Sequence, residues 1–314
     1  MRYADTVTKV LAGGKTPAGT HRPIMSDEIV EVLAPQPGDI LVDCTLGFGG
    51  HALELLRRII PNGRLIGFDA DPIELPKTEL RLRNEGFSLD AFTAIHGNFA
   101  GLPQALAQSQ VNGADGILAD LGVSSMQLDD PARGFSTKGN GPLDMRMNPA
   151  RGYPASAVLA RLDAVKLARL FEENADEPDA QRIAAAVAQQ SFRTNSELVA
   201  AVRTALSGRA RDYVELAVRR VFQALRIAVN DEFSALDTLL RHLPACLKPG
   251  GRVAILTFHS GEDRRVKKSF EAGLREGVYE AIATEVTRPS AAEQHDNPRS
   301  KPAKLRWAKR SDHS

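Results

Sequence analysis

Short apolar runs, separated by polar or glycine-rich turns, mark the first 120 residues of the chain. Apolar runs that are too short for a helix and rich in β-branched residues are typical of buried strands. Apolar residues at helical spacing lie around and between these runs and predict helices at residues 26–33, 52–60 and 72–84. Such repeats predict an α/β protein with a parallel, doubly wound sheet whose ligand binds at the carboxyl ends of the strands. The four predicted strands lie at residues 40–44, 64–68, 91–96 and 115–120.

The next clear strand, at residues 252–258, begins about 130 residues after the fourth, which is far more chain than a compact crossover needs. The pattern therefore predicts an insertion that opens with a polar, glycine-rich loop at residues 122–152. A long helical run at 214–247, which could break at Asn230, then leads back to the sheet. The helices predicted inside the insertion lie near residues 154–161, 163–174, 178–191 and 195–207.

These elements predict three parts of the chain. Residues 1–20 form an N-terminal arm, residues 21–125 and 213–314 form the sheet domain, and residues 126–212 form an inserted loop and helical domain. A strand pair at 279–287 and 303–308 is expected to close the sheet.

The composition is that of an ordinary globular protein, with 43% hydrophobic and 25% charged residues among 314. Because the net charge is only +1, a surface for nucleic acid would have to be local. Cys44 and Cys246 predict buried thiols rather than a disulfide or a zinc site, and no metal constellation is evident. No apolar run could span a membrane and no signal peptide is evident, so we expect a cytoplasmic protein.

The turn after the first strand contains Gly47, Gly49, Gly50 and His51. Glycines at this place let a ligand lie against the backbone, so strand, glycine turn and helix together outline a nucleotide site. An ordinary turn between strand and helix is the alternative. The third glycine of the dinucleotide fingerprint is missing, which favours another adenosine-bearing cofactor over NAD, with S-adenosylmethionine as the obvious choice.

Carboxylates end two further strands. Asp69 is placed to accept the hydroxyls of a ribose, with a capping role as the alternative, and Asp71 is expected to cap the following helix. Phe99, after the third strand, could lie against an adenine or pack in the core. Asp120 ends the fourth strand, between the expected cofactor and the long loop.

Several longer motifs follow one another along the chain. They are His21-x-Pro23, Asp43-x-Thr45-Leu46-Gly47-x-Gly49-Gly50-His51, Asp120-Leu121-Gly122-Val123-Ser124-Ser125-x-Gln127-Leu128-Asp129-Asp130, Arg133-Gly134-Phe135-Ser136, Gly141-Pro142-Leu143-Asp144-Met145-Arg146-Met147, Phe222-Gln223-Ala224-Leu225-Arg226-Ile227-x-Val229-Asn230-Asp231-Glu232, Phe258-His259-Ser260 and Asn297-Pro298-Arg299-Ser300. In these motifs the chain resembles, from residue 21 to its end, the bacterial small-subunit ribosomal RNA cytidine N4-methyltransferases, the RsmH/MraW family. The departures are Met126, Gly261 and the string Asp176-Glu177-Pro178-Asp179, which leave room for a shifted RNA target.

The resemblance implies a class I, Rossmann-like methyltransferase fold with a helical insert for RNA. It implies N4-methylation of a cytidine in the decoding region of small-subunit (16S) ribosomal RNA, with S-adenosylmethionine as methyl donor. The expected partner is the assembled or nearly assembled small subunit, and a homodimer is one expected state. The cofactor contacts that carry over are Gly49, Gly50, His51, Asp69, Phe99, Asp120 and Gln127.

An exocyclic amine is a weak nucleophile, so an acceptor must lie beside it. Asp120 and Asp144 are candidates, although an ion pair with Arg133 or Arg146 would explain Asp144 equally well. Phe135 or the Phe258-His259 pair could stack the base. The expected RNA-binding residues are Phe135, Arg146, His259, Arg299, Lys301 and Lys304.

The basic run at residues 299–310, which contains Trp307, could instead be a solvated face. Two other functions remain open from sequence alone. One is an amino-methyltransferase that acts on DNA or on another RNA. The other is a ribosome-assembly factor that binds the cofactor without turnover.

Overall fold

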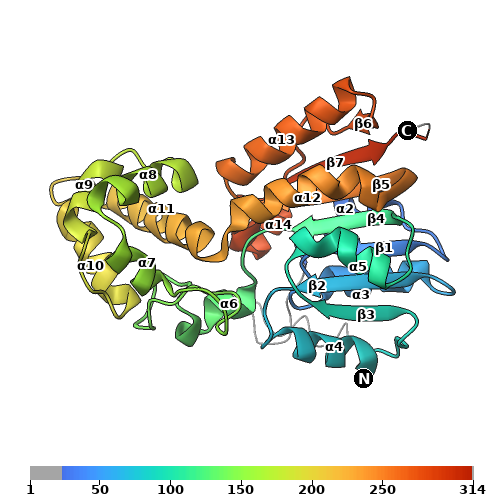
Figure 1. The fold of residues 1–314 in the computed structure, drawn as a ribbon, viewed down its shortest axis with the longest axis horizontal. Helices are drawn as coiled ribbons and strands as arrows, with labels where there is room; N and C mark the ends of the chain where they lie inside the picture. The colour runs from blue at the N-terminus through green and yellow to red at the C-terminus, as the bar shows by residue number, and fades with distance from the viewer. Residues whose placement is uncertain (1–22, 313–314) are drawn as a thin grey trace.

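The computed structural model describes residues 23–312 and centres on a seven-stranded sheet (Figure 1). The strand order is β3-β2-β1-β4-β5-β7-β6. Strands β1 to β5 run parallel, while β7 runs antiparallel to both neighbours. The predicted doubly wound fold is therefore confirmed. The strands are β1 (Ile40–Asp43), β2 (Arg64–Asp69), β3 (Phe92–His96), β4 (Ala114–Asp120), β5 (Leu247–Thr257), β6 (Tyr279–Ile282) and β7 (Lys304–Arg310).

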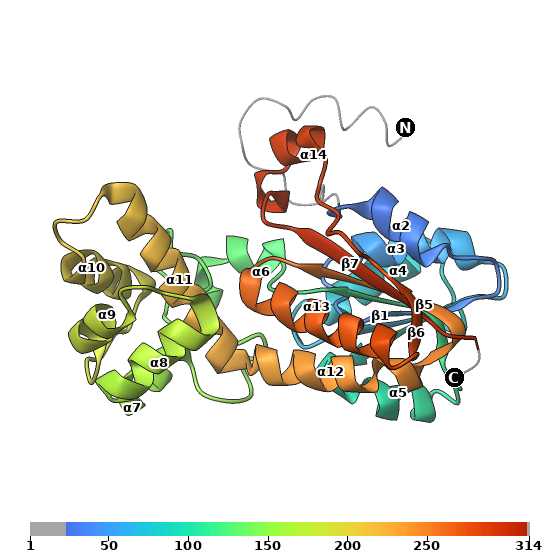
Figure 2. The ribbon, with the colours of Figure 1, turned by 90° about the horizontal axis from the view of Figure 1, so that it is seen from above.

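Helices cover both faces of this sheet (Figure 2). Leu41 and Leu118 point to the face covered by α2, α3 and α4, whereas Val42 and Ile117 point to the face covered by α5, α12 and α13. This alternation is the two-residue period of a strand that is buried on both sides. The helices are α2 (Ser26–Leu33), α3 (Gly50–Ile59), α4 (Leu75–Asn84), α5 (Leu102–Gln108), α12 (Glu232–Cys246) and α13 (Ser260–Arg275).

The insertion forms a second, helical lobe with its own core, to one side of the sheet (Figures 1 and 2). The face of α11 that carries Val214, Val218 and Leu225 lies in this core. The helical lobe therefore extends to Asn230, beyond the boundary at residue 212 expected from sequence. Its elements are α6 (Ser125–Asp129), η2 (Pro131–Arg133), α7 (Ala155–Arg161), α8 (Ala164–Ala175), α9 (Ala180–Val187), α10 (Asn195–Ala205) and α11 (Arg211–Asn230).

The predicted break near Asn230 is present. Asp231 adopts a left-handed backbone conformation (φ 51°) and separates α11 from α12. The N-terminal arm predicted at residues 1–20 lies outside the described residues. Within residues 23–312, no helix is long and apolar enough to cross a membrane.

Candidate active site

The glycine turn between β1 and α3 is held close to its neighbours. Gly49 has a φ of +82°, and a Cβ at this position would lie 2.8 Å from the Thr78 side chain. A Cβ on Gly50 would lie 3.2 Å from Pro23. The Thr78 hydroxyl donates to the Gly47 carbonyl at 2.5 Å. Glycine is thus required here by close packing as well as by backbone conformation, which fixes the turn beside the strand ends.

Three acids, Asp43, Asp69 and Asp120, end the neighbouring strands β1, β2 and β4. Asp69 accepts hydrogen bonds from the backbone N–H groups of Gly47 and Asp71, both at 2.8 Å. Burial raises the pKa of Asp43 to about 6, although His51 and the Thr45 backbone N–H act in the opposite direction. Burial likewise raises the pKa of Asp69 to about 6. These carboxyl groups are poised to titrate near neutral pH, which is common at functional sites.

His51 and Asp120 face each other across this edge of the sheet. His51 Nε2 lies 3.7 Å from Asp120 Oδ2, which is too long for a hydrogen bond. His51 Nε2 and Asp120 Oδ1 are both buried without a hydrogen-bond partner within residues 23–312. Buried polar atoms without partners usually mark a place where a ligand or water supplies the missing contact. The site therefore suits a cofactor with hydroxyl groups, an ammonium group and a positive charge, as S-adenosylmethionine has.

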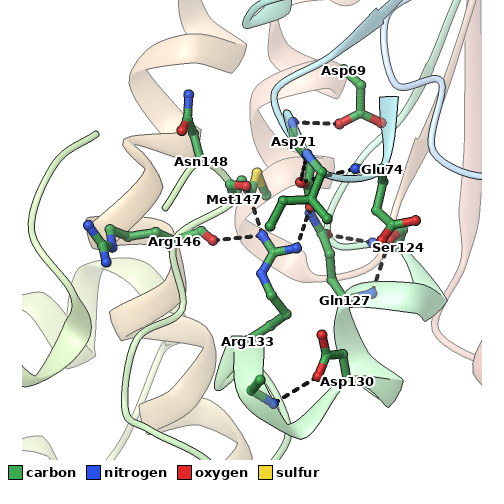
Figure 3. Close-up of polar contacts among 12 residues, drawn as sticks. Asp69, Asp71, Glu74, Ser124, Gln127, Asp130, Arg133, Arg146, Met147 and Asn148 are labelled. Carbon is green, nitrogen blue, oxygen red and sulfur yellow. Dashed lines mark hydrogen bonds and ion pairs between the residues drawn. The ribbon is translucent and has the colours of Figure 1, made fainter. Parts of the chain in front are cut away.

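Gln127 was expected to contact the cofactor directly, and its amide is engaged within the protein. Its Oε1 accepts from the Ser124 N–H at 3.0 Å, and its Nε2 donates to Asp71 Oδ2 at 2.8 Å (Figure 3). Arg133 donates to the same Asp71 oxygen at 2.6 Å. Gln127 therefore supports the turn that follows Asp69, and a direct contact with the cofactor stays a prediction. Phe99 is half-buried against the sheet core, so its contact with an adenine also stays a prediction.

Two expected residues of the long loop have structural roles. Asp144 forms a two-fold ion pair with Arg146, at 2.8 and 2.7 Å. Burial alone would raise the pKa of Asp144, but the hydrogen bonds from Arg146 outweigh it and lower the pKa. The ion-pair alternative is therefore observed, and a contact of Asp144 with the amine stays a prediction. Phe135 was expected to stack the base, and this expectation is corrected by the structure. Its side chain is only 7% exposed and packs in the core of the helical lobe, where it offers little surface to a base.

A second group of polar residues lies beyond the end of β5. Arg226 of α11 donates twice to Glu232 at 2.8 Å and lies 3.9 Å from Glu262. Glu262 also lies 3.1 Å from His259 Nε2. A Cβ on Gly122 would lie 3.8 Å from Arg226 and 4.0 Å from Phe258, so this group borders the backbone that follows Asp120.

Several residues of the basic run at 299–310 pair with acids, while its RNA-binding role stays a prediction. Arg299 pairs with Asp129. Lys304 and Arg306 both bind Asp263, at 3.0 and 2.6 Å. Lys301 is exposed and forms no ion pair within the described part of the chain. Within strand β7, Lys304 and Arg306 therefore share a largely buried acid, whereas Arg299 and Lys301 lie before the strand at the surface.

Three important residues escaped the sequence-based list of site residues. Asp43 was visible as an acid directly before the glycine turn, at a position equivalent to those of Asp69 and Asp120. Arg226 and its partner Glu232 stand in one motif of the resemblance, whereas the partner of Arg133, Asp71, lies 62 residues away in the sequence. Such pairing has no local signal. Among residues 23–312, no cluster of His, Cys, Asp or Glu side chains is arranged to hold a metal ion.

Comparison with known proteins identifies close relatives over almost the whole chain. The family model described as the MraW methylase family matches residues 18–311. Ribosomal RNA small subunit methyltransferase H 2 of Alkaliphilus metalliredigens is 47% identical over 98% of this chain and 90% of that protein. Ribosomal RNA small subunit methyltransferase H 1 of Lachnoclostridium phytofermentans is 43% identical over 98% of this chain and 86% of that protein.

One similar solved structure is an rRNA methylase from Streptococcus thermophilus. It aligns with a TM-score of 0.42 at 14% identity, over 94% of this chain and 99% of that chain.

Proposed function

The chain belongs to the MraW methylase family, and from this premise we propose that it methylates N4 of a cytidine in small-subunit ribosomal RNA. The methyl donor is S-adenosylmethionine. The observation that carries the proposal is the buried acceptor Asp120 Oδ1, which has no partner among the described residues and ends β4 beside the glycine turn. A site of this kind supplies an acceptor where a positively charged cofactor and an amine must meet.

The edge formed by β1, β2 and β4 would hold the cofactor. Asp69 would accept from the ribose hydroxyls while it keeps its two backbone hydrogen bonds, because each carboxylate oxygen can accept more than one. The backbone turn at Gly49 and Gly50 and the imidazole of His51 would line the opposite side. When bound, the cofactor supplies an electrophilic methyl group on a sulfonium.

The residues after Asp120 would receive the cytosine. The amine lone pair is delocalised into the ring, so acceptors beside the N4 hydrogens favour the pyramidal geometry that attack needs. Asp120 and the backbone around Gly122 are suited to this task. Phe258 would be the candidate to stack the base, since Phe135 is buried. The His259 side chain is only 10% exposed and lies 3.1 Å from Glu262, so its contact with RNA stays a prediction. The cytidine would have to leave its helix to reach this position.

We further propose that the substrate is the assembled or nearly assembled small subunit in the cytoplasm, and that the target lies in the decoding region. Because the net charge is only +1, the protein has no strong overall field that would attract RNA. This supports recognition of a folded particle through local contacts. A homodimer is the oligomeric state that we propose to test, by light scattering of the purified protein.

A direct test uses small subunits from cells that lack the gene. The purified protein, with a methyl-labelled donor, should form N4-methylcytidine in their RNA, identified by mass spectrometry of the digested nucleosides. Free ribosomal RNA and DNA of the same sequence serve as matched substrates. Preference for DNA would overturn the proposed substrate. Intact binding of S-adenosylhomocysteine without any methyl transfer would indicate an assembly factor instead.

Asp120→Asn tests whether the buried Asp120 Oδ1, which has no hydrogen-bond partner among the described residues, serves the cofactor or the reaction. We expect weaker S-adenosylhomocysteine binding and a smaller loss of single-turnover rate at saturation, because displacement of the methyl donor by about 1 Å can slow a reaction about a hundredfold. If the variant keeps both the wild-type affinity for S-adenosylhomocysteine and the wild-type single-turnover rate, Asp120 has no role in the site.

A further inference from the structure

The side chain of Arg133 connects the expected cofactor turn with the loop that precedes the helical lobe. Its Nη1 donates to Asp71 Oδ2 at 2.6 Å. Its Nη2 donates to the carbonyls of Arg146 and Met147, at 3.1 and 2.8 Å (Figure 3). Residues 146–148 are called the strap below. One buried guanidinium thus ties a carboxylate of the sheet lobe to the backbone of the strap.

The sheet-lobe end of this connection reaches the cofactor turn itself. Asp71 is fully buried, and its backbone N–H donates to Asp69 Oδ1 at 2.8 Å. The other oxygen of Asp69 accepts from the Gly47 N–H of the glycine turn. The path from Gly47 to the strap is therefore a continuous series of hydrogen bonds through Asp69, Asp71 and Arg133.

The strap is also held from its other sides. The Met147 N–H donates to Asn230 Oδ1 at 2.8 Å, at the carboxyl end of α11. Asn148 Nδ2 lies 3.5 Å from His96 Nε2. His96 pairs in register with Asp69 on the neighbouring strand, so the strap crosses the sheet edge at the level of Asp69. The strap therefore lies between the two lobes, next to the place proposed for the cofactor.

Arginine is suited to this position in a way that lysine is not. The three acceptors lie in different directions, and a planar guanidinium with five N–H donors can reach all of them at once. A lysine would keep the charge beside Asp71 but would act as a compact point charge. Gln127 supports the same carboxylate with one hydrogen bond, yet it makes no bond to the strap.

We propose that Arg133 is a positioning residue that couples the cofactor site to the strap, so that cofactor binding orders the loop against which the RNA must dock. A ligand on Asp69 fixes the turn at Asp69 and Asp71, and Arg133 transmits that order to the carbonyls of Arg146 and Met147. Order gained in one site is then order that the second ligand no longer has to supply, which makes the two binding events cooperative. This inference rests on the proposed function for its RNA part, but its cofactor part is independent of it.

Hydrogen–deuterium exchange of the full chain tests the cofactor part without any RNA. In the wild type, saturating S-adenosylhomocysteine should slow exchange in peptides that cover the strap by about tenfold. Arg133→Met should abolish this slowing while the dissociation constant of S-adenosylhomocysteine changes less than about threefold, and Arg133→Lys should restore part of it. The proposal is overturned if S-adenosylhomocysteine leaves exchange in the wild-type strap unchanged, or if it slows exchange in Arg133→Met as much as in the wild type.

Arg264→Met is the matched control. Arg264 also joins the two lobes, through Asp176 at 3.1 and 3.0 Å, but contacts neither Asp71 nor the strap. Its loss should leave the ligand-induced slowing intact, and loss of the slowing in this variant would contradict a path through Arg133. If Arg133→Met fails to fold, Asp71→Asn replaces it, because an amide NH2 group in place of Asp71 Oδ2 cannot accept from Arg133 or Gln127 and so breaks the same link.

Equilibrium dialysis tests the RNA part, with labelled S-adenosylhomocysteine and small subunits from cells that lack the gene. Subunits should tighten ligand binding to the wild type severalfold and should have no such effect on Arg133→Met. Equal affinity with and without bound subunits in the wild type overturns the coupling. Absence of any subunit binding would instead count against the proposed function and leave the exchange result to decide on Arg133.

Discussion

The acids at the edge of the sheet and the acids between the two lobes have opposite surroundings. Asp43, Asp69 and Asp120 have no arginine or lysine partner anywhere in residues 23–312. The acids that join the lobes each bind an arginine. These pairs are Asp71 with Arg133, Glu262 with Arg226, and Asp176 with Arg264.

This contrast separates acids with a structural role from acids with a binding role. Between the lobes, an arginine compensates the charge of each carboxylate, and for Asp71 and Glu262 it offsets part of the penalty of burial. At the sheet edge the negative charge is uncompensated, and burial raises the pKa of Asp43 and Asp69 to about 6. Such an edge is complementary to a sulfonium and an ammonium group, which supports the proposal that the cofactor supplies the missing positive charge.

Arg226→Leu should have the largest effect on stability. It leaves Glu232 and Glu262 buried without their cation and should lower the free energy of unfolding by about 3 to 5 kcal/mol. Asp43→Asn should instead raise the free energy of unfolding by about 1 to 3 kcal/mol near neutral pH, because the variant has no ionised carboxylate buried at this position. Denaturant titration measures both.

Arg264→Leu is the control for this pair of variants. Its ion pair with Asp176 is solvent-exposed, so its loss should change the free energy of unfolding by less than about 1 kcal/mol. A cost as large as that of Arg226→Leu would mean that burial does not decide the strength of these pairs.

Asp69→Ala should weaken S-adenosylhomocysteine binding by about 1 to 3 kcal/mol, since the ribose hydroxyls lose a charged acceptor. Isothermal titration calorimetry measures the change. Asp176→Ala, which removes an acid of the other class, should leave the affinity unaltered. Unchanged affinity in Asp69→Ala would remove the edge acid from the cofactor site.

As pH rises from about 4 to about 6, the affinity for S-adenosylhomocysteine and the stability of the fold should change in opposite directions. Asp43 and Asp69 have folded-state pKa values of about 6, above the ordinary value of 3.8. The unfolded chain therefore releases these protons first, and the contribution of both groups to stability declines as pH rises from about 4 to about 6. Affinity for S-adenosylhomocysteine should increase over the upper part of this range, as the carboxylates form. Calorimetry and unfolding curves at matched pH values test both, and affinity that is flat between about pH 5 and about pH 7 would contradict a role for these acids.

Replacement of Arg299, Lys301 and Lys304 by alanine should have the smallest effect. Two of these residues already bind acids, so only Lys301 is available to release counterions from RNA. We expect the slope of log affinity against log salt concentration to fall by about 1 and not by about 3. Filter binding with small subunits at several salt concentrations measures the slope, and a fall of about 3 would restore the run as an RNA-binding surface.

The sequence predicted elements whose signals are local. Strands β1 to β4 were found because short apolar runs precede a glycine or an acid, and the helical lobe was found because a crossover of that length must contain an insertion. Two short helices were missed, α5 with 7 residues and α6 with 5, although α7, also with 7 residues, was found.

The errors at the site have a different cause. Phe135 looked available for stacking because its loop is polar, yet its ring packs against residues of distant helices. Lys304 and Arg306 formed a basic run in sequence, yet Asp263 lies 41 and 43 residues before them and binds both. Long-range pairing of charges leaves no mark in composition or spacing, so these roles became visible only in three dimensions.

The position of β7 between β5 and β6 determines when the protein can finish folding during synthesis. The helical lobe is built from one continuous segment and can form its core while the chain is still growing. The sheet must wait, because β5 keeps an open edge and β6 has no neighbour until residues 304–310 emerge from the ribosome. Asp263 is left without Lys304 and Arg306 over the same interval. A chain that ends before residue 304 would therefore expose the edge of β5, and an unpaired strand edge favours aggregation.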